Sequence, residues 1–190
     1  MAWFKRKEKN LKDSEKKTIP DGLWDKCPSC NEIIYKPELE KKLSVCHHCS
    51  HHFRIPPEIY VDLLLDKGTE IRHFEKLVSK DFLKFKANKA YQDQILAAKS
   101  KTGENDAIRV YEGKMDGRKV ILGIMNFSFI GGSMGSVVGE AVSRALVIAG
   151  EKGVPLILIC SSGGARMQEG AISLMQLAKT STQLARFSKN

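Results

Sequence analysis

The residues best suited to chemistry in this sequence are four cysteines arranged in two pairs. Cys27 and Cys30 form one C-x2-C turn, and Cys46 and Cys49 form a second after a spacer of 15 residues. Zn²⁺ in structural sites prefers four tetrahedral ligands, and each C-x2-C turn presents two thiolates. A thioredoxin-like redox pair is the alternative, but it needs only one such turn beside a βαβ unit. The pattern therefore predicts one structural Zn²⁺ ion per chain, which would stabilise a module with few core residues.

Other metal-binding or nucleophilic side chains accompany these pairs. Four histidines crowd the second turn, at positions 47, 48, 51 and 52. A mixed Cys/His site stays open, although solvated histidines are the simpler interpretation because four cysteines already complete a zinc shell. Cys160 ends an apolar run, where a lone cysteine is expected to be a small core residue and a nucleophile is the alternative.

Two glycine-rich segments could bind a substrate through the backbone. One runs from Ser161 to Gly170 and contains Gly163 and Gly164, between an expected buried strand and an expected helix. Adjacent N–H groups at a helix start can form an oxyanion hole for an enolate or a tetrahedral intermediate. An ordinary tight turn is an equally good interpretation of the pattern alone. The other segment, residues 131–136, matches neither a Walker A loop nor a Rossmann fingerprint.

Acid–base side chains are scarce around these segments. Between Gly123 and Gly170 the ionisable residues are Glu140, Arg144, Glu151, Lys152, Cys160, Arg166 and Glu169, and His73 is the last histidine. A triad hydrolase is therefore disfavoured, and a site that works through backbone hydrogen bonds fits better. Arg166 and Glu169 are expected to pair on an exposed first helical turn.

The elements that position these residues follow from periodicity. Strands are expected at 108–113 and 119–126 around an Asp-Gly turn, a helix at 137–150, a doubly buried strand at 156–160 and a second helix at 171–187. This order predicts an α/β layer architecture. We divide the chain into a mobile basic tail (1–20), a zinc-ribbon module (21–57), a helical connector (58–104) and an α/β domain (105–190).

Composition narrows the class of protein. The chain has 190 residues, 42% of them hydrophobic, and 31 basic against 22 acidic side chains give a formal charge of +9. This is a globular composition without a membrane span or a secretory signal, so we expect a cytoplasmic protein. A zinc-ribbon nucleic-acid binder is an alternative prompted by the ribbon and the basic tail, but no interleaved aromatic and basic surface is visible.

The combination and order of these motifs resemble one family. The two cysteine pairs, the segment 131–136 and the segment 162–170 resemble the carboxyltransferase beta subunits of bacterial acetyl-CoA carboxylase. The resemblance implies a crotonase-like (ClpP-like) fold of β-β-α units behind a zinc ribbon. It also implies transfer of a carboxyl group from carboxybiotin to acetyl-CoA, giving malonyl-CoA for fatty acid synthesis.

The resemblance further implies site residues and partners. Backbone amides of Gly163 and Gly164 would hold the enolate oxygen, and the biotin nitrogen would serve as the base. Six further residues would contact substrate, namely Gly131, Gly132, Ser133, Met134, Gly135 and Arg166. The implied partners are a carboxyltransferase alpha subunit in an α2β2 heterotetramer, a biotin carboxyl carrier protein bearing biotin, and biotin carboxylase.

One departure from the family concerns length. Members of the family continue for further strand–helix units, and residues 105–190 are too few for a complete fold of this kind. The sequence is therefore expected to be truncated and its crotonase-like domain incomplete. Another crotonase-like acyl-CoA enzyme, such as a hydratase with Glu140 or Glu169 as its base, is a further alternative.

Overall fold

The computed structural model describes residues 22–189, which fall into two compact units. The boundary lies between Ile55 and Pro56. The predicted basic tail at 1–20 lies outside the described residues. Among the helices of the described residues, none is long and apolar enough to cross a membrane.

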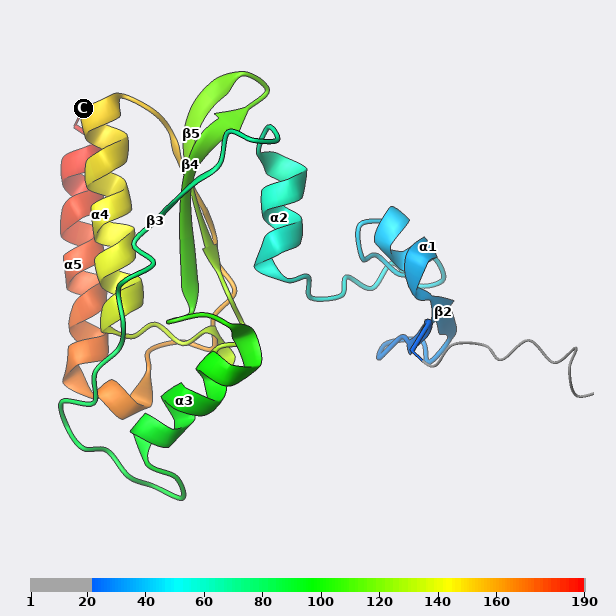
Figure 1. The fold of residues 1–190 in the computed structure, drawn as a ribbon, viewed down its shortest axis with the longest axis horizontal. Helices are drawn as coiled ribbons and strands as arrows, with labels where there is room; N and C mark the ends of the chain where they lie inside the picture. The colour runs from blue at the N-terminus through cyan, green and yellow to red at the C-terminus, as the bar shows by residue number, and fades with distance from the viewer. Residues whose placement is uncertain (1–21, 190) are drawn as a thin grey trace, which may run out of the picture. The chain divides into compact units, whose positions relative to one another are not determined.

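The first unit is built around cysteine sulfurs rather than a large apolar core. Strand β1 (Trp24–Lys26) pairs antiparallel with β2 (Ile33–Tyr35), and helix α1 (Lys36–Lys41) follows directly (Figure 1). Its core consists of Cys27, Ile34, Leu39 and Cys46, with Cys30 and Phe53 packed against them. So few apolar side chains are a weak driving force for folding, which agrees with the prediction that a metal stabilises this unit.

The second unit contains a four-stranded sheet in the order β3-β4-β5-β6. Strands β3 (Ile71–His73), β4 (Ile108–Met115) and β5 (Arg118–Met125) are antiparallel, and β6 (Leu156–Ile159) runs parallel to β5. Asp116 and Gly117 form the two-residue turn between β4 and β5, and both have positive φ, at 50° and 76°. The hairpin predicted at this Asp-Gly turn is therefore confirmed.

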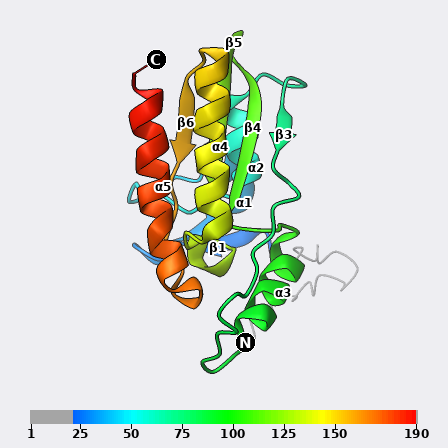
Figure 2. The same ribbon diagram turned by 90° about the vertical axis from the view of Figure 1, so that its left-hand side faces the viewer.

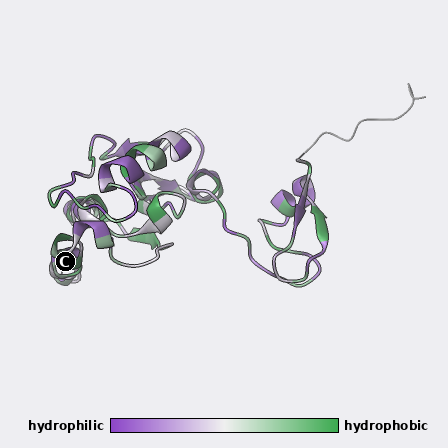
Figure 3. Ribbon diagram, turned by 90° about the horizontal axis from the view of Figure 1, so that it is seen from below, coloured by the Kyte–Doolittle hydropathy of each residue, from purple (hydrophilic) through white to green (hydrophobic). Residues whose placement is uncertain are grey.

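Helices cover both faces of this sheet (Figures 1 and 2). Val110 and Ile121 point to the face that packs on α4 (Ser136–Lys152), whereas Tyr111 and Leu122 point to the opposite face with α2 (Pro57–Leu64). Helix α5 (Ala171–Phe187) packs along α4, and α3 (Tyr91–Thr102) adds its residues to the α4-side core. In Figure 3 these helices carry both hydrophilic and hydrophobic residues, as expected of amphipathic helices.

Two predictions about the elements need correction. Residues 58–101 are not continuously helical, because α2 and α3 are separated by β3, which joins the sheet, and by irregular chain. The strand predicted to be buried on both faces, β6, is the edge strand of the described sheet, and Leu158 is 39% exposed. Cys160, expected in the core, follows this edge and is exposed.

Candidate functional site

The four predicted cysteine ligands come together in the first unit. Their sulfur atoms all lie within 4.8 Å of one another. Cys27 Sγ is 3.7 Å from Cys49 Sγ, and Cys30 Sγ is 3.8 Å from Cys46 Sγ. A tetrahedron with Zn–S bonds of about 2.3 Å has edges of about 3.8 Å, whereas a disulfide needs about 2.05 Å. The donor set and its spacing therefore fit one Zn²⁺ ion.

The two cysteine turns have the same backbone geometry. In the first, Asn31 N–H donates to Cys27 O at 2.9 Å, and Asn31 has a φ of 62°. In the second, Ser50 N–H donates to Cys46 O at 2.9 Å, and Ser50 has a φ of 59°. Each turn thus presents its two sulfurs in the same way, from two places far apart in the sequence. The backbone N–H of His51 lowers the pKa of the Cys49 thiol. At Cys30 a backbone hydrogen bond at Glu32 lowers the pKa, but burial and the other three cysteines together raise it, so Cys49 ionises more readily than Cys30.

The histidines beside the second turn have other partners. His47 stacks on His48 with ring centroids 4.0 Å apart, and its Nδ1 lies 4.0 Å from Glu38. His51 meets the ring of Phe53 edge-on. Within residues 22–189 the metal-binding group consists of the four cysteines, so the mixed Cys/His alternative is not supported.

The two glycine-rich segments of the second unit lie side by side. Met134 N–H donates to Gly164 O at 2.8 Å, and Arg166 N–H donates to Met134 O at 2.9 Å. These two bonds form a short parallel bridge between Met134 and Ala165. Gly163 N–H adds a third link, to Gly131 O at 2.9 Å. The two segments are therefore one composite loop, at the ends of β5 and β6 that precede α4 and α5.

Two glycines in this composite loop are required by close contacts. Gly132 has a φ of +64°, and a Cβ there would lie 2.1 Å from Ser161 O. A Cβ at Gly135 would lie 2.6 Å from Glu169 Oε1 and 2.8 Å from Arg166 Nη1. Any side chain at either position would separate the two segments.

Gly163 and Gly164 lie on the exposed part of the composite loop. Gly164 has a φ of +110° and no atom within 4 Å of a Cβ position. Its N–H donates to Ser162 Oγ at 3.0 Å, while Gly163 N–H donates to Gly131 O. Both candidate oxyanion donors therefore have partners within the chain, and an oxyanion would have to replace them.

Arg166 is fully buried, which corrects the prediction of an exposed pair with Glu169. Its Nη2 donates to Asp106 Oδ1 at 2.7 Å, and its Nη1 donates to Asp106 Oδ2 at 3.0 Å. Nη2 and Nε reach Ser133 O and Ser133 Oγ at 2.8 and 3.1 Å. Although burial alone would lower it, the hydrogen bonds and charge of Asp106 hold the pKa of Arg166 above its ordinary value. The side chain positions the loop and has no surface that a substrate could touch.

Glu169 completes this buried cluster at the start of α4. Its Oε2 accepts from Ser136 N–H at 2.6 Å, and its Oε1 accepts from Tyr91 OH at 2.6 Å. A carboxylate at a helix N-terminus is stabilised by the unpaired N–H groups and the helix dipole. Burial raises the pKa of Tyr91 to about 12, so its hydroxyl stays protonated and keeps donating. Both oxygens of the Glu169 carboxylate are thus occupied by hydrogen bonds within the chain.

The sequence-based predictions missed three members of the cluster. Ser79, Tyr91 and Asp106 all contact Arg166, and all come from the region between β3 and β4. A weak signal existed at Asp106, which lies two residues before a predicted strand.

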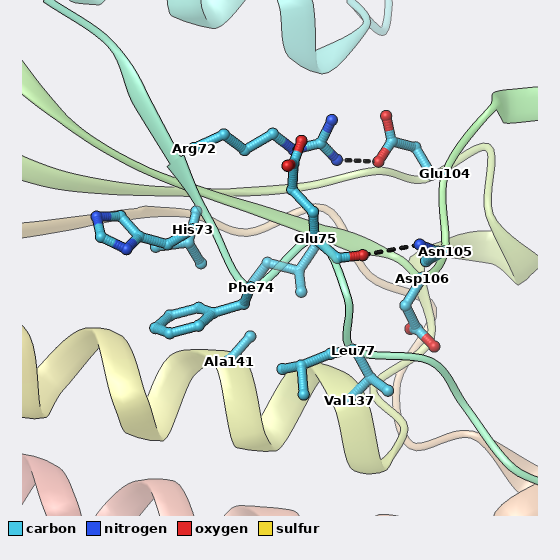
Figure 4. A pocket seen from close by; sticks show the side chains of 12 residues that line it. Arg72, His73, Phe74, Glu75, Leu77, Glu104, Asn105, Asp106, Val137 and Ala141 are labelled. Carbon is cyan, nitrogen blue, oxygen red and sulfur yellow. Dashed lines mark hydrogen bonds and ion pairs between the residues drawn. The ribbon is translucent and has the colours of Figure 1, made fainter.

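A small cavity elsewhere in the second unit offers no comparable site. It lies between β3, the segment before β4, and α4 (Figure 4). Its polar lining groups pair with each other: Arg72 donates to Glu104, and Asn105 Nδ2 donates to Glu75 O at 2.7 Å. Val137 and Ala141 of α4 line its other side. Because its polar groups are already paired, we do not regard this cavity as a ligand site.

We predict that removing one cysteine ligand abolishes zinc binding in the full chain. Cys46→Ser should lower the zinc-to-protein ratio from one to near zero after dialysis and should unfold the first unit, because metal binding and folding are coupled. Elemental analysis of purified, reduced protein measures the ratio. Cys160→Ser, the matched control outside the cluster, should keep it at one. Full zinc content in Cys46→Ser would contradict the four-thiolate site.

We also predict that Arg166→Met destabilises the second unit by about 3–5 kcal/mol, because it leaves the carboxylates of Asp106 and Glu169 buried without their cation. Arg144→Met is the matched control, since Arg144 forms an exposed pair with Glu140 one helical turn away and should cost about 1 kcal/mol or less. Chemical denaturation gives both values. Equal losses of unfolding free energy in the two variants would contradict the claim that the buried cluster stabilises the second unit.

Comparisons with known proteins identify the family. The Carboxyl transferase domain matches residues 71–190, and the Acetyl-CoA carboxylase zinc finger domain matches residues 24–49. The chain is 44% identical over 191 residues to the acetyl-coenzyme A carboxylase carboxyl transferase subunit beta of Pedobacter heparinus, covering all of this chain and 68% of that protein. It is 46% identical over 186 residues to the same subunit of Chlorobaculum parvum, covering 98% and 67%.

Solved structures agree on the fold. A transcarboxylase 12S structure with methylmalonyl-coenzyme A and methylmalonic acid bound has a TM-score of 0.54 at 24% identity, over 66% of this chain and 22% of that one. The beta subunit of P. aeruginosa geranyl-CoA carboxylase has a TM-score of 0.53 at 20% identity, over 80% and 24%. These likenesses confirm the predicted α/β, crotonase-like carboxyltransferase fold. Together with the sequence matches, they show that the chain belongs to the family of acetyl-coenzyme A carboxylase carboxyl transferase beta subunits.

Proposed function

We propose that this chain provides the enolate-stabilising site of an acetyl-CoA carboxylase, which moves a carboxyl group from carboxybiotin to acetyl-CoA and forms malonyl-CoA. The observation that carries the proposal is the composite glycine loop, which combines exposed backbone donors with acid–base side chains that are already paired. Family membership supplies the substrates, since the relatives at 44 and 46% identity carry this name.

The role proposed for the loop is to hold negative charge on oxygen. When the methyl group of acetyl-CoA loses a proton, charge moves to the thioester oxygen. Backbone N–H groups of Gly163 and Gly164 are dipoles that can stabilise this enolate once they are released from their present partners, Gly131 O and Ser162 Oγ. The absence of side chains lets the thioester approach the backbone closely.

The hydrogen bonds of the two glycines suggest which donor is released most easily. Gly164 N–H is held by the hydroxyl of exposed Ser162, which can rotate away without moving the backbone. Gly163 N–H is held by a backbone carbonyl in the bridge region, so its release requires a shift of the loop. We therefore assign the leading role to Gly164.

The proton that leaves the methyl group needs an acceptor outside this loop. Carboxybiotin supplies both the carboxyl group and, once its N–CO₂ bond breaks, a basic ureido nitrogen. The new C–C bond of malonyl-CoA forms as that nitrogen takes the proton, so no side chain of this chain has to act as the base. Biotin would be brought on the carboxyl carrier protein after biotin carboxylase has loaded it. An alpha subunit, in an α2β2 assembly, would complete the site.

The geometry disfavours the alternative of a hydratase-like enzyme with a carboxylate base. Glu169 is buried and accepts from Ser136 N–H and Tyr91 OH. Glu140 pairs with Lys179 and Arg144, whose hydrogen bonds lower its pKa, with Lys179 contributing most. Neither carboxylate is available to remove a proton from a bound thioester.

We predict that Gly164→Val lowers the rate of malonyl-CoA formation by roughly 10²–10³ in the full-length subunit assembled with its alpha partner. Valine disfavours the φ of +110° at this position, so its N–H moves away from the oxyanion, and losing the hydrogen bond from one oxyanion donor has an effect of that size. Ser162→Ala should keep the rate within about threefold, since the hydroxyl only competes for the donor. Steady-state assays with carboxybiotin and acetyl-CoA measure both.

Gly153→Val is the matched control for this experiment. Gly153 also has a positive φ, 61°, and open space around its Cβ position, but it caps the far end of α4. It places the same side chain at a positive φ without touching the loop. Near wild-type activity in Gly164→Val, or equal loss in Gly153→Val, would contradict the oxyanion assignment.

A further inference from the structure

We infer that residues 80–89, a lysine-rich segment that follows Ser79, bind the phosphate groups of the acyl-CoA substrate. The inference rests on the proposed function and adds a subsite for the nucleotide end of CoA. Within ten residues the segment carries four exposed lysines, at positions 80, 84, 86 and 89. Asp81 is its single acidic residue, so its net charge is 4 − 1 = +3.

The lysine segment lies against the composite glycine loop. Ser79, which directly precedes it, accepts from Arg166 Nη1 at 2.9 Å and donates to Glu169 Oε1 at 3.2 Å. Leu83 within the segment reaches Gly170, where a Cβ would lie 3.0 Å from Leu83 Cδ1. Gln168 Nε2 also donates to Gln94 Oε1 in α3, just after the segment, at 2.8 Å. The segment therefore flanks the loop that is proposed to hold the thioester.

The charges of this segment are not used by the fold. Lys36, Lys152 and Lys179 pair with carboxylates of the described residues. Across residues 22–189, no ion pair involves the ammonium groups of the four lysines in this segment. Asp81, the nearest acid in sequence, instead accepts from Phe85 N–H at 3.0 Å. Unpaired cations concentrated in one place attract a polyanion from a distance.

Exposed apolar groups accompany these charges. Phe82 is 61% exposed within the segment, and Met167 is 76% exposed on the neighbouring glycine loop. An aromatic side chain between lysines suits a ligand that joins phosphates to a flat base. CoA has this chemistry, with a diphosphate and a 3′-phosphate next to adenine. Its long, uncharged pantetheine arm can reach from the segment to the glycines.

The test neutralises this segment and compares it with a charge-matched control. Lys84→Gln/Lys86→Gln/Lys89→Gln is compared with Lys67→Gln/Lys114→Gln/Lys119→Gln, three exposed lysines around the β4–β5 hairpin. Figure 1 places that hairpin at the opposite end of the unit from the lysine segment. Both variants are made in the full-length subunit with its alpha partner. All substituted side chains are exposed, and thermal unfolding checks that both variants fold.

The segment variant should raise the KM for acetyl-CoA about tenfold with kcat unchanged, since each screened surface contact contributes severalfold at most. Its KM should also depend less on salt. The wild type should prefer acetyl-CoA over acetyl-dephospho-CoA, and this preference should shrink in the segment variant. The control should stay within twofold of wild type. An equal KM in the two variants would overturn the subsite while leaving the proposed function intact.

Direct binding separates the remaining outcomes. If the wild-type complex forms no malonyl-CoA, the proposed function fails, and calorimetry with acetyl-CoA still decides the subsite by whether the segment variant binds more weakly than the control. A segment variant that loses affinity for a short single-stranded RNA but keeps the wild-type KM would assign the lysines to nucleic acid and overturn the inference.

Discussion

The buried ion pair between Arg166 and Asp106 is the interaction on which the candidate site depends. A guanidinium without solvent is tolerated only when its donors are matched, and here two bonds to one carboxylate are joined by bonds to Ser133. Ser133 belongs to the first glycine segment and Arg166 to the second, so the bonds from Arg166 to Ser133 fix the separation of the segments, while Asp106 holds the guanidinium in place. The side chains of Arg166 and Glu169 lie so close to Gly135 that this position has no room for a side chain. The exposed glycines therefore stand on a rigid support.

This support has a chemical consequence. The charged side chains nearest the exposed glycines already have partners within the chain. Arg166 pairs with Asp106, and Glu169 accepts hydrogen bonds from Tyr91 and from the first turn of α4. What remains for a substrate is backbone N–H, which suits an enolate and leaves proton removal to the other reactant. The first unit lacks a large apolar core, and its four cysteines are placed to bind a metal. Four thiolates bound to Zn²⁺ would stabilise a module that has few apolar side chains, whereas hydrogen bonds and charge stabilise the glycine-rich composite loop.

Local patterns could be predicted from the sequence, and long-range burial could not. The Asp-Gly turn predicted the position of the hairpin, and the helix at 171–187 has the predicted bounds. The spacing of the four cysteines correctly predicted that they come together. The burial of Arg166 was missed because its partners Asp106, Tyr91 and Ser79 are 60 to 87 residues away. The exposure of β6 was missed because an apolar run does not reveal whether a strand lies inside a sheet or at its edge. The roles of the glycine amides remain predictions, since the chain alone shows only how those amides are bonded.

Amide hydrogen exchange tests the central claim, that a buried charge cluster makes the composite loop rigid, most directly. In the wild-type chain the N–H groups of Met134 and Arg166 form the bridge between the two segments, whereas Gly164 N–H is held only by an exposed hydroxyl. A rigid support predicts that the two bridge amides exchange only when the second unit unfolds, while Gly164 exchanges far faster. Bridge amides that exchange as quickly as Gly164 would show that the loop opens locally, and would contradict this account.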